Sequence, residues 1–103
     1  MTNKIINLTP HVINILSGNI VPSGTVARVT EIATSAGQFD GIELVHKAYG
    51  DVIDLPEPKK GVLYIVSAMV RLALPTRTDL ASPGDQIRNS SGQIVGVKNL
   101  VIN

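Results

Sequence analysis

The sequence Val62-Leu63-Tyr64-Ile65-Val66 is the strongest indication of the fold in this chain. Its apolar side chains follow one another without polar alternation, which is typical of a strand that is covered on both faces. Gly61 comes directly before this run and Ser67 directly after it. We therefore expect residues 62–66 to form the central strand of a sheet and to anchor the hydrophobic core.

The residues after this strand change in character. Ser67 is placed as a helix N-cap, and Ala, Met, Arg and Leu, which favour helix, follow it up to Pro75. A short helix is expected here, with an extended strand as the alternative because the run spans only two turns. Residues 75–85 contain Pro75, Pro83 and Gly84, and we expect them to form an ordered loop.

Most of the remaining chain predicts strands, because Val and Ile alternate with polar residues. The candidate strands are residues 11–16, 25–32, 42–49, 86–89 and 93–97. The last two flank a turn that ends at Gly92, which is a hairpin pattern. A break is expected at 36–41, and Pro56 and Pro58 predict a loop or sheet edge at 51–60. The fold class expected is α+β, mainly β, with about six strands and at most one short helix.

Composition limits the functional classes. The 103 residues fit one compact domain, residues 1–103, and the absence of cysteine removes disulfides, thiolate zinc sites, iron–sulfur clusters and thiol catalysis. A net charge of +1 disfavours nucleic-acid and membrane partners. No segment reaches the roughly 18 to 20 apolar residues of a membrane span, and the N-terminal apolar run is broken too early for a signal peptide. We therefore expect a cytoplasmic protein.

Self-association is also expected. Only about two-thirds of the surface of a chain of this length becomes buried on folding, whereas 44% of the residues are apolar. Aromatic residues make up only 3% of the chain, so exchange of a strand or loop is a better basis for a homo-oligomer than aromatic hot spots.

Catalytic motifs are absent from the sequence. It contains no phosphate-binding loop, no nucleophile elbow and no zinc-protease motif, and His11 and His46 are 35 residues apart. Each histidine is expected on the exposed face of a strand. Asp51, Asp54 and Glu57 lie in a Pro-rich segment and are interpreted as solvated. We therefore predict no catalytic residue, no metal site and no cofactor.

Arginines provide the best candidates for a binding site. Arg71, Arg77 and Arg88 lie in or near the irregular region that follows Ser67, and the planar guanidinium group suits phosphate. The first amides of a helix capped by Ser67 also favour an anion. The structural alternative is that Arg77 pairs with Asp79 or Asp85 to hold the loop together, while Ser67 merely caps the helix.

Several motifs are spread along nearly the whole chain. They are Asn7-Leu8-Thr9-Pro10-His11, residues 22–29, Asp40-Gly41-Ile42, Leu55-Pro56, residues 61–67, Arg77-x-Asp79 with Pro83, and Gly92-x-Ile94-x-Gly96. Together they resemble a family of small uncharacterised proteins of phage and bacterial genomes, and the resemblance implies a phage or prophage setting. Val97 stands where that family has a cysteine near the C-terminal strand, which argues against a thiol-based function.

These observations predict a non-enzymatic binding protein in the bacterial host cell. In a phage setting the ligand that fits is nucleotide-like, such as a cyclic dinucleotide or an ADP-ribose derivative that serves as a bacterial immune signal and is sequestered. The expected ligand-binding residues, some of them from neighbouring strands or a second subunit, are Arg77, Asp79, Ser67, Arg71, Arg88, His11 and Arg28. The alternatives are a virion or assembly component and a small phosphodiesterase that uses His11 or His46 as acid or base.

Overall fold

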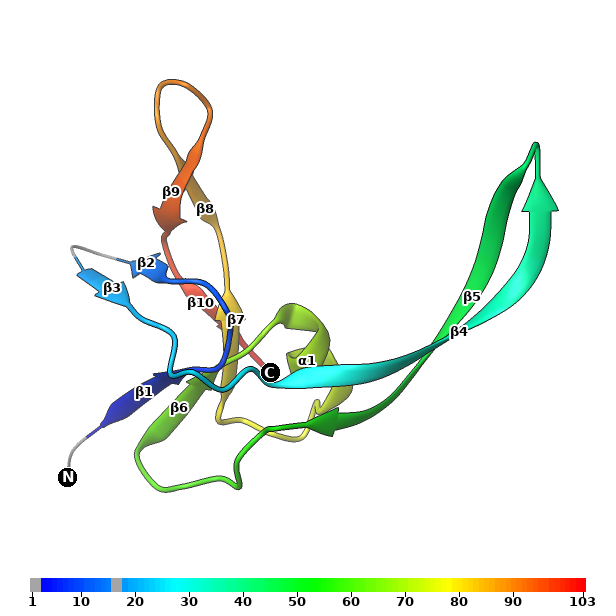
Figure 1. Cartoon of the computed structure of the whole chain (residues 1–103). Helices are drawn as coiled ribbons and strands as arrows, with labels where there is room; N and C mark the ends of the chain where they lie inside the picture. Colours follow the sequence, from blue (N-terminus) through cyan, green and yellow to red (C-terminus); the bar gives the residue numbers. More distant parts are fainter. Residues whose placement is uncertain (1–2, 16–17) are drawn as a thin grey trace.

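The computed structural model describes residues 3–15 and 18–103, and within them the chain forms ten strands and one helix (Figure 1). The elements are β1 (Lys4–Asn7), β2 (Ile13–Ile15), β3 (Gly18–Ile20), β4 (Arg28–Phe39), β5 (Ile42–Ile53), β6 (Val62–Ile65), α1 (Ala68–Ala73), β7 (Leu80–Pro83), β8 (Gln86–Arg88), β9 (Ile94–Val97) and β10 (Leu100–Ile102). The predicted fold class, α+β and mainly β with one short helix, is confirmed. The strands outnumber the expected six because many are only three or four residues long.

The stretch around Tyr64 is the centre of the first sheet. This sheet has the order β1-β6-β7-β10, and β6 is parallel to both of its neighbours. The amide of Leu8 donates to the carbonyl of Ile65 at 2.8 Å on one side, and the amide of Val66 donates to the carbonyl of Ala81 at 2.8 Å on the other. The expected central strand at residues 62–66 is therefore confirmed, and its last residues are fully buried.

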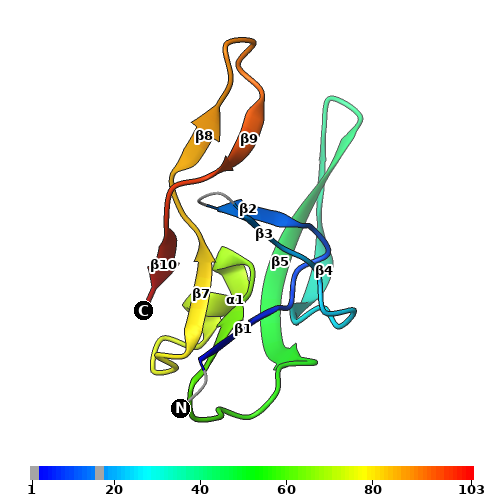
Figure 2. The same ribbon diagram turned by 90° about the vertical axis from the view of Figure 1, so that its left-hand side faces the viewer.

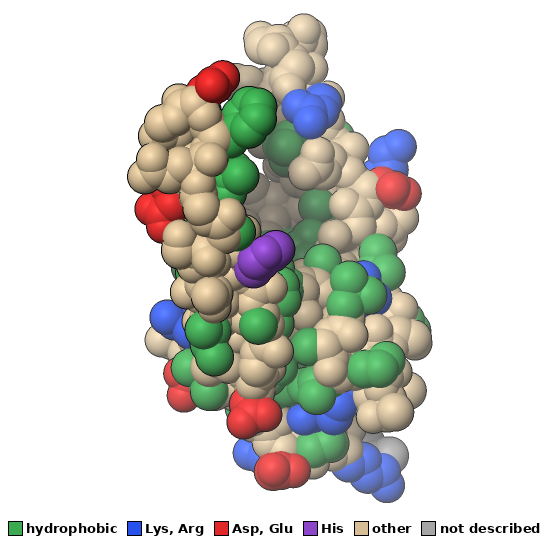
Figure 3. Space-filling model, turned by 90° about the vertical axis from the view of Figure 1, so that its right-hand side faces the viewer, with side chains coloured by type: hydrophobic (Ala, Val, Ile, Leu, Met, Phe, Trp, Pro, Cys, Tyr) green, Lys and Arg blue, Asp and Glu red, His purple; other side chains and the backbone are tan. Residues whose placement is uncertain are grey.

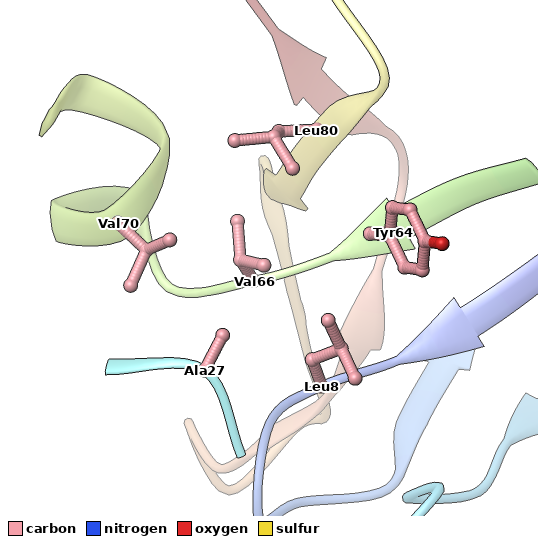
Figure 4. Close-up of a cluster of buried hydrophobic side chains, with 6 residues drawn as sticks. All are labelled: Leu8, Ala27, Tyr64, Val66, Val70 and Leu80. Carbon is pink, nitrogen blue, oxygen red and sulfur yellow. The ribbon is translucent and has the colours of Figure 1, made fainter. Parts of the chain in front are cut away.

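The segment after β6 is a helix, as predicted, and not the alternative strand. Ser67 is the N-cap of α1, and its Oγ accepts a hydrogen bond from the amide of Val70 at 3.3 Å. Val70 is the buried residue of α1 and packs in the core with Leu8, Ala27, Tyr64, Val66 and Leu80. Tyr64 and Val66 come from the same stretch and the other side chains from separate segments, and they point toward one another (Figure 4).

The prediction of a loop at residues 75–85 is wrong for residues 80–83, which form β7 beside β6. Leu80, Ala81 and Ser82 are buried, and β7 pairs with β6 on one side and antiparallel with β10 on the other. The flanking Pro and Gly residues obscured the strand because its apolar part is only two residues long. Pro83 ends the strand and its partner there is Leu100.

The second sheet lies beside the first and has the order β3-β2-β9-β8. It contains the predicted hairpin of β8 and β9, and its core residues Ile13 and Val97 pack against Ile65 of the first sheet. Of the strand predicted at 11–16, β2 occupies Ile13–Ile15, and Leu16 lies outside the described residues.

Asn7 holds the turn that connects the two sheets. Its Nδ2 donates to the carbonyls of His11 at 2.8 Å and Ile20 at 3.0 Å, and its Oδ1 accepts from the amide and the hydroxyl of Thr9. Both residues are buried. The Asn7-x-Thr9 part of the N-terminal motif therefore has a structural role.

The third sheet is a long hairpin formed by β4 and β5, with 12 residues in each strand. It projects away from the two other sheets (Figures 1 and 2), and all of its residues from 30 to 51 are exposed. We call residues 30–51 the arm. The predicted break at 36–41 is narrower than expected, because β4 continues to Phe39 and the turn is Asp40-Gly41. The loop expected from residue 51 begins later, after Ile53.

Candidate functional site

Arg77 and Asp79 form a two-point ion pair. Arg77 Nε donates to Asp79 Oδ1 at 2.8 Å, and Nη2 donates to Oδ2 at 2.7 Å and to the carbonyl of Pro56 at 3.1 Å. Hydrogen bonding from Arg77 lowers the pKa of Asp79 and that from Asp79 raises the pKa of Arg77, although partial burial opposes both shifts. The structural alternative for this pair is therefore present, because Arg77 joins the segment before β7 to the loop at Pro56.

Arg71 also binds its own chain. Its Nε donates to Ser82 Oγ at 2.9 Å, and its Nη1 donates to Asn103 Oδ1 at 3.2 Å. The side-chain amide of Asn103 in turn donates to the carbonyls of Arg71, Leu74 and Arg77. The structure thus brings Ser67, Arg71, Arg77 and Asp79 to the region between α1 and β7, where intramolecular contacts occupy much of their hydrogen-bonding capacity.

The other three predicted residues lie elsewhere. Arg88 is in the β8–β9 hairpin, where its guanidinium donates to the carbonyl of Gly92 at 2.7 Å. Arg28 is exposed at the start of β4, opposite Ile53. His11 lines a shallow groove of about 330 Å³ together with residues of β2, β8 and β9. Within one chain, the seven predicted residues do not converge on a single pocket.

A larger groove, of about 520 Å³, lies where β1, β6 and the segment before β7 meet. Its lining residues are Asn3, Lys4, Ile5, Lys59, Gly61, Val62, Leu63, Thr78 and Asp79. We call it the lysine groove. Of the seven predicted residues, Asp79 is the one in its lining.

The pairing of β1 with β6 places both lysines in the lining of this groove. Lys4 lies opposite Val62 in the β1–β6 pairing, and its amide donates to the carbonyl of Gly61 at 2.7 Å. The turn that precedes β6 is closed by a hydrogen bond of 3.1 Å from the amide of Val62 to the carbonyl of Lys59. Lys4 was not among the expected site residues, and the Pro-rich segment beside Lys59 was interpreted as solvated, because no local pattern reveals that residues 4 and 59 line one groove.

Neither Lys4 nor Lys59 forms an ion pair with another described residue. In the part of the chain that the structure describes, ion pairs join Glu31 to Lys47 and Arg77 to Asp79, so neither Lys4 nor Lys59 has a carboxylate partner there. The residues that line the groove are thus two lysines, several apolar residues, Thr78 and Asp79. This donor set suits an anionic organic molecule.

Residues 3–15 and 18–103 contain no group of three His, Asp or Glu side chains arranged to hold a metal ion. Over the same ranges, no helix is long and apolar enough to cross a membrane.

No family model matches the chain, and no curated protein or solved structure matches it. The chemistry proposed for the lysine groove therefore rests on the residues of this chain.

Proposed function

We propose that this protein is a non-enzymatic binding protein that sequesters a small, anionic, nucleotide-like ligand in the lysine groove. The observation that carries the proposal is the pair Lys4 and Lys59, which flank a groove with an apolar lining and have no carboxylate partner among the described residues. A phosphorylated ligand would supply the missing negative charge.

Each part of the groove matches one part of such a ligand. The ammonium groups of Lys4 and Lys59 attract phosphate as point charges. Ile5 and Leu63, which lie opposite each other in the β1–β6 pairing, offer apolar surface to a base. Asp79 is held ionised by Arg77, so its carboxylate accepts hydrogen bonds and suits a ribose hydroxyl. Arg77 then acts by positioning Asp79.

The positions of the histidines favour binding over hydrolysis. His11 lines the other groove and His46 lies in the arm, so neither belongs to the lysine groove. A phosphodiesterase would require a general acid or base within hydrogen-bond reach of its substrate. In the phage or prophage setting that we propose, the ligand is a cyclic dinucleotide or an ADP-ribose derivative used as an immune signal in the host cytoplasm.

The test is equilibrium dialysis of the purified protein against a panel of cyclic dinucleotides and ADP-ribose derivatives. The variants are Lys59→Gln and, as a matched control, Lys60→Gln, which changes the neighbouring lysine outside the groove lining. One charge-assisted contact is worth about 1.5 to 3 kcal/mol, so Lys59→Gln should weaken binding roughly ten- to a hundredfold. Lys60→Gln should bind like wild type.

The bound ligand is then released by heating and analysed by mass spectrometry. Recovery of the unchanged ligand supports sequestration, whereas a cleaved ligand overturns it in favour of a phosphodiesterase. Absence of binding across the panel, or equal effects of Lys59→Gln and Lys60→Gln, also contradicts the proposal.

A second candidate function is that of a virion or assembly component. The exposed arm favours it, because assembly proteins need projecting segments that reach a neighbour. This function predicts that the protein copurifies with phage particles through density-gradient centrifugation, and its absence from purified particles would exclude it.

A further inference from the structure

The arm has two chemically different faces. Residues that lie opposite each other in the β4–β5 pairing share a face, and alternate residues along a strand do so as well. The pairs Ile32 with Ala48, Thr34 with His46, and Phe39 with Ile42 are therefore on one face, together with Leu44. We call this the apolar face, and its four large side chains, Ile32, Phe39, Ile42 and Leu44, are all exposed.

The opposite face is mixed, because it carries an ion pair and also the exposed side chain of Tyr49, which lies opposite Glu31. Glu31 and Lys47 lie on it, and Lys47 Nζ is 3.1 Å from Glu31 Oε1. Val45 also belongs to this face because it follows Leu44 directly in β5. A two-stranded hairpin is marginally stable by itself in water. It is normally stabilised by burying its apolar face against another layer of the protein. In this chain, the described residues leave that face uncovered.

The exposed surface of the chain is larger than that of a compact monomer. Its accessible area is 7241 Å², whereas a folded monomer of 10.9 kDa exposes about 5,600 Å². Its radius of gyration is 16.7 Å, compared with about 13 Å for a compact chain of this length. The excess area is about 1,600 Å², and a standard interface needs about 800 Å² from each partner. The chain therefore has enough unburied surface for a stable interface.

We propose that the apolar face of the arm packs against a second copy of this chain in a two-fold dimer, with the arm of each copy lying on the other. A strand of 12 residues is about 40 Å long, and two strands are about 10 Å wide, so one face of the arm offers about 400 Å². That is about half of what one partner contributes to a standard interface. In a reciprocal dimer, each copy also buries an equal area where it receives the partner's arm. The area buried on each copy then reaches that of a standard interface.

The space beside the arm suits this arrangement. Figure 3 shows a hollow between the arm and the rest of the molecule, with hydrophobic side chains on both of its sides. The net charge of +1 creates no strong repulsion between two copies. A two-fold axis makes the contact reciprocal, so every copy supplies both the apolar face of its arm and the surface that receives the partner's arm.

The test measures the mass of the full chain in solution by sedimentation equilibrium. The matched pair of variants is Leu44→Ser and Val45→Ser, because these neighbours are 44% and 46% exposed but lie on opposite faces of the arm. We expect wild type and Val45→Ser to be dimers at tens of micromolar, and Leu44→Ser to dimerise at least tenfold more weakly. The double variant Phe39→Ser with Ile42→Ser should be monomeric.

Circular dichroism and thermal melting of each variant check that the two other sheets remain folded. A monomeric wild type at about 100 µM, or equal weakening by Leu44→Ser and Val45→Ser, would overturn the proposal. A larger assembly in place of a dimer would overturn it too. The arm and the lysine groove share no residue, so loss of ligand binding in Lys59→Gln should leave the dimer mass unchanged.

Discussion

Arg77 donates hydrogen bonds to both carboxylate oxygens of Asp79, from Nε to Oδ1 at 2.8 Å and from Nη2 to Oδ2 at 2.7 Å. Its Nη2 also donates to the carbonyl of Pro56. The side chains are only 20% and 17% exposed, so solvent screens the pair less than it screens an ordinary surface ion pair. One residue thereby fixes the loop before β6 to the entry of β7 and sets the charge of a carboxylate in the lysine groove.

Because of this pair, the free energy of unfolding should depend on pH in the acidic range. The pKa of Asp79 is lowered in the folded state from its ordinary value of 3.8, so its stabilisation is present above that pH and is lost as the pH falls through the folded-state pKa. We expect Asp79→Asn to lower the free energy of unfolding by about 1 to 2 kcal/mol at neutral pH, with a difference from wild type that shrinks below pH 3.8. Urea denaturation at several pH values measures it.

The control for this series is Glu43→Gln, which removes an exposed carboxylate of the arm far from the pair. Its difference from wild type should not reproduce the acid dependence of Asp79→Asn. A constant difference between Asp79→Asn and wild type from neutral pH down to acid unfolding would contradict the role assigned to the pair.

Asn7 should tolerate no change of its amide. In the wild type, Asn7 Nδ2 donates hydrogen bonds to the carbonyls of His11 and Ile20. Asn7→Asp keeps the shape of the side chain but places a buried carboxylate against these two carbonyls. We expect a loss of at least about 3 kcal/mol, because the variant loses two donors and buries a charge. Asn19→Asp, at an exposed position of β3, is the control and should change stability little. Equal denaturation midpoints for the two variants would refute the role of Asn7.

Gly96 is required by a close approach between strands. A Cβ added there would lie 2.8 Å from the carbonyl oxygen of Asn14 in the adjacent strand β2, so the backbone would have to shift. Gly96→Ala is expected to destabilise the fold by about 1 to 3 kcal/mol in thermal or chemical unfolding. At Gly18 nothing lies within 4 Å, and Gly18→Ala should be within about 0.5 kcal/mol of wild type. An equally small effect at both positions would show that β2 and β9 are farther apart.

Leu80 tests whether β7 belongs to the core. It is fully buried in the cluster around Val66, and Leu80→Ala should cost about 2 to 5 kcal/mol through lost burial and a cavity. Leu72→Ala makes the same chemical change on the exposed side of α1 and should have an effect below about 1 kcal/mol. Similar losses for the two variants in urea denaturation would contradict the placement of β7.

The elements that the sequence predicted well are those marked by a pattern within a few consecutive residues. The unbroken apolar run at residues 62–66, the Ser67 cap and the turn at Gly92 each identify their element within a few residues. The short strand β7 was missed because its hydrogen-bonding partners, β6 and β10, are brought to it by the sheet and not by its own composition. Its apolar residues alone do not distinguish it from a loop.

The candidate site was predicted less well for the same reason. The closeness of Arg77 and Asp79 follows from their separation of two residues, whereas the placement of Lys4 and Lys59 in the lining of one groove depends on the parallel pairing of β1 with β6. For the arm, the sequence pattern is insufficient for a different reason. Alternation of apolar and polar residues reports that a strand has two kinds of face, but it does not report whether the same chain covers the apolar one.

The parallel pairing of β1 with β6 also leads us to expect a particular order of assembly. Every contact between these strands spans more than fifty residues, from Lys4 to Val62 and from Asn7 to Ile65, and such distant pairing is slow because a large loop must close first. The β4–β5 turn joins residues that are adjacent in the chain, and hairpins close within about 1 to 10 µs. We therefore expect the arm to close and reopen while the central sheet is still open, because a hairpin alone is marginally stable, and its apolar face to be exposed to neighbouring chains during folding.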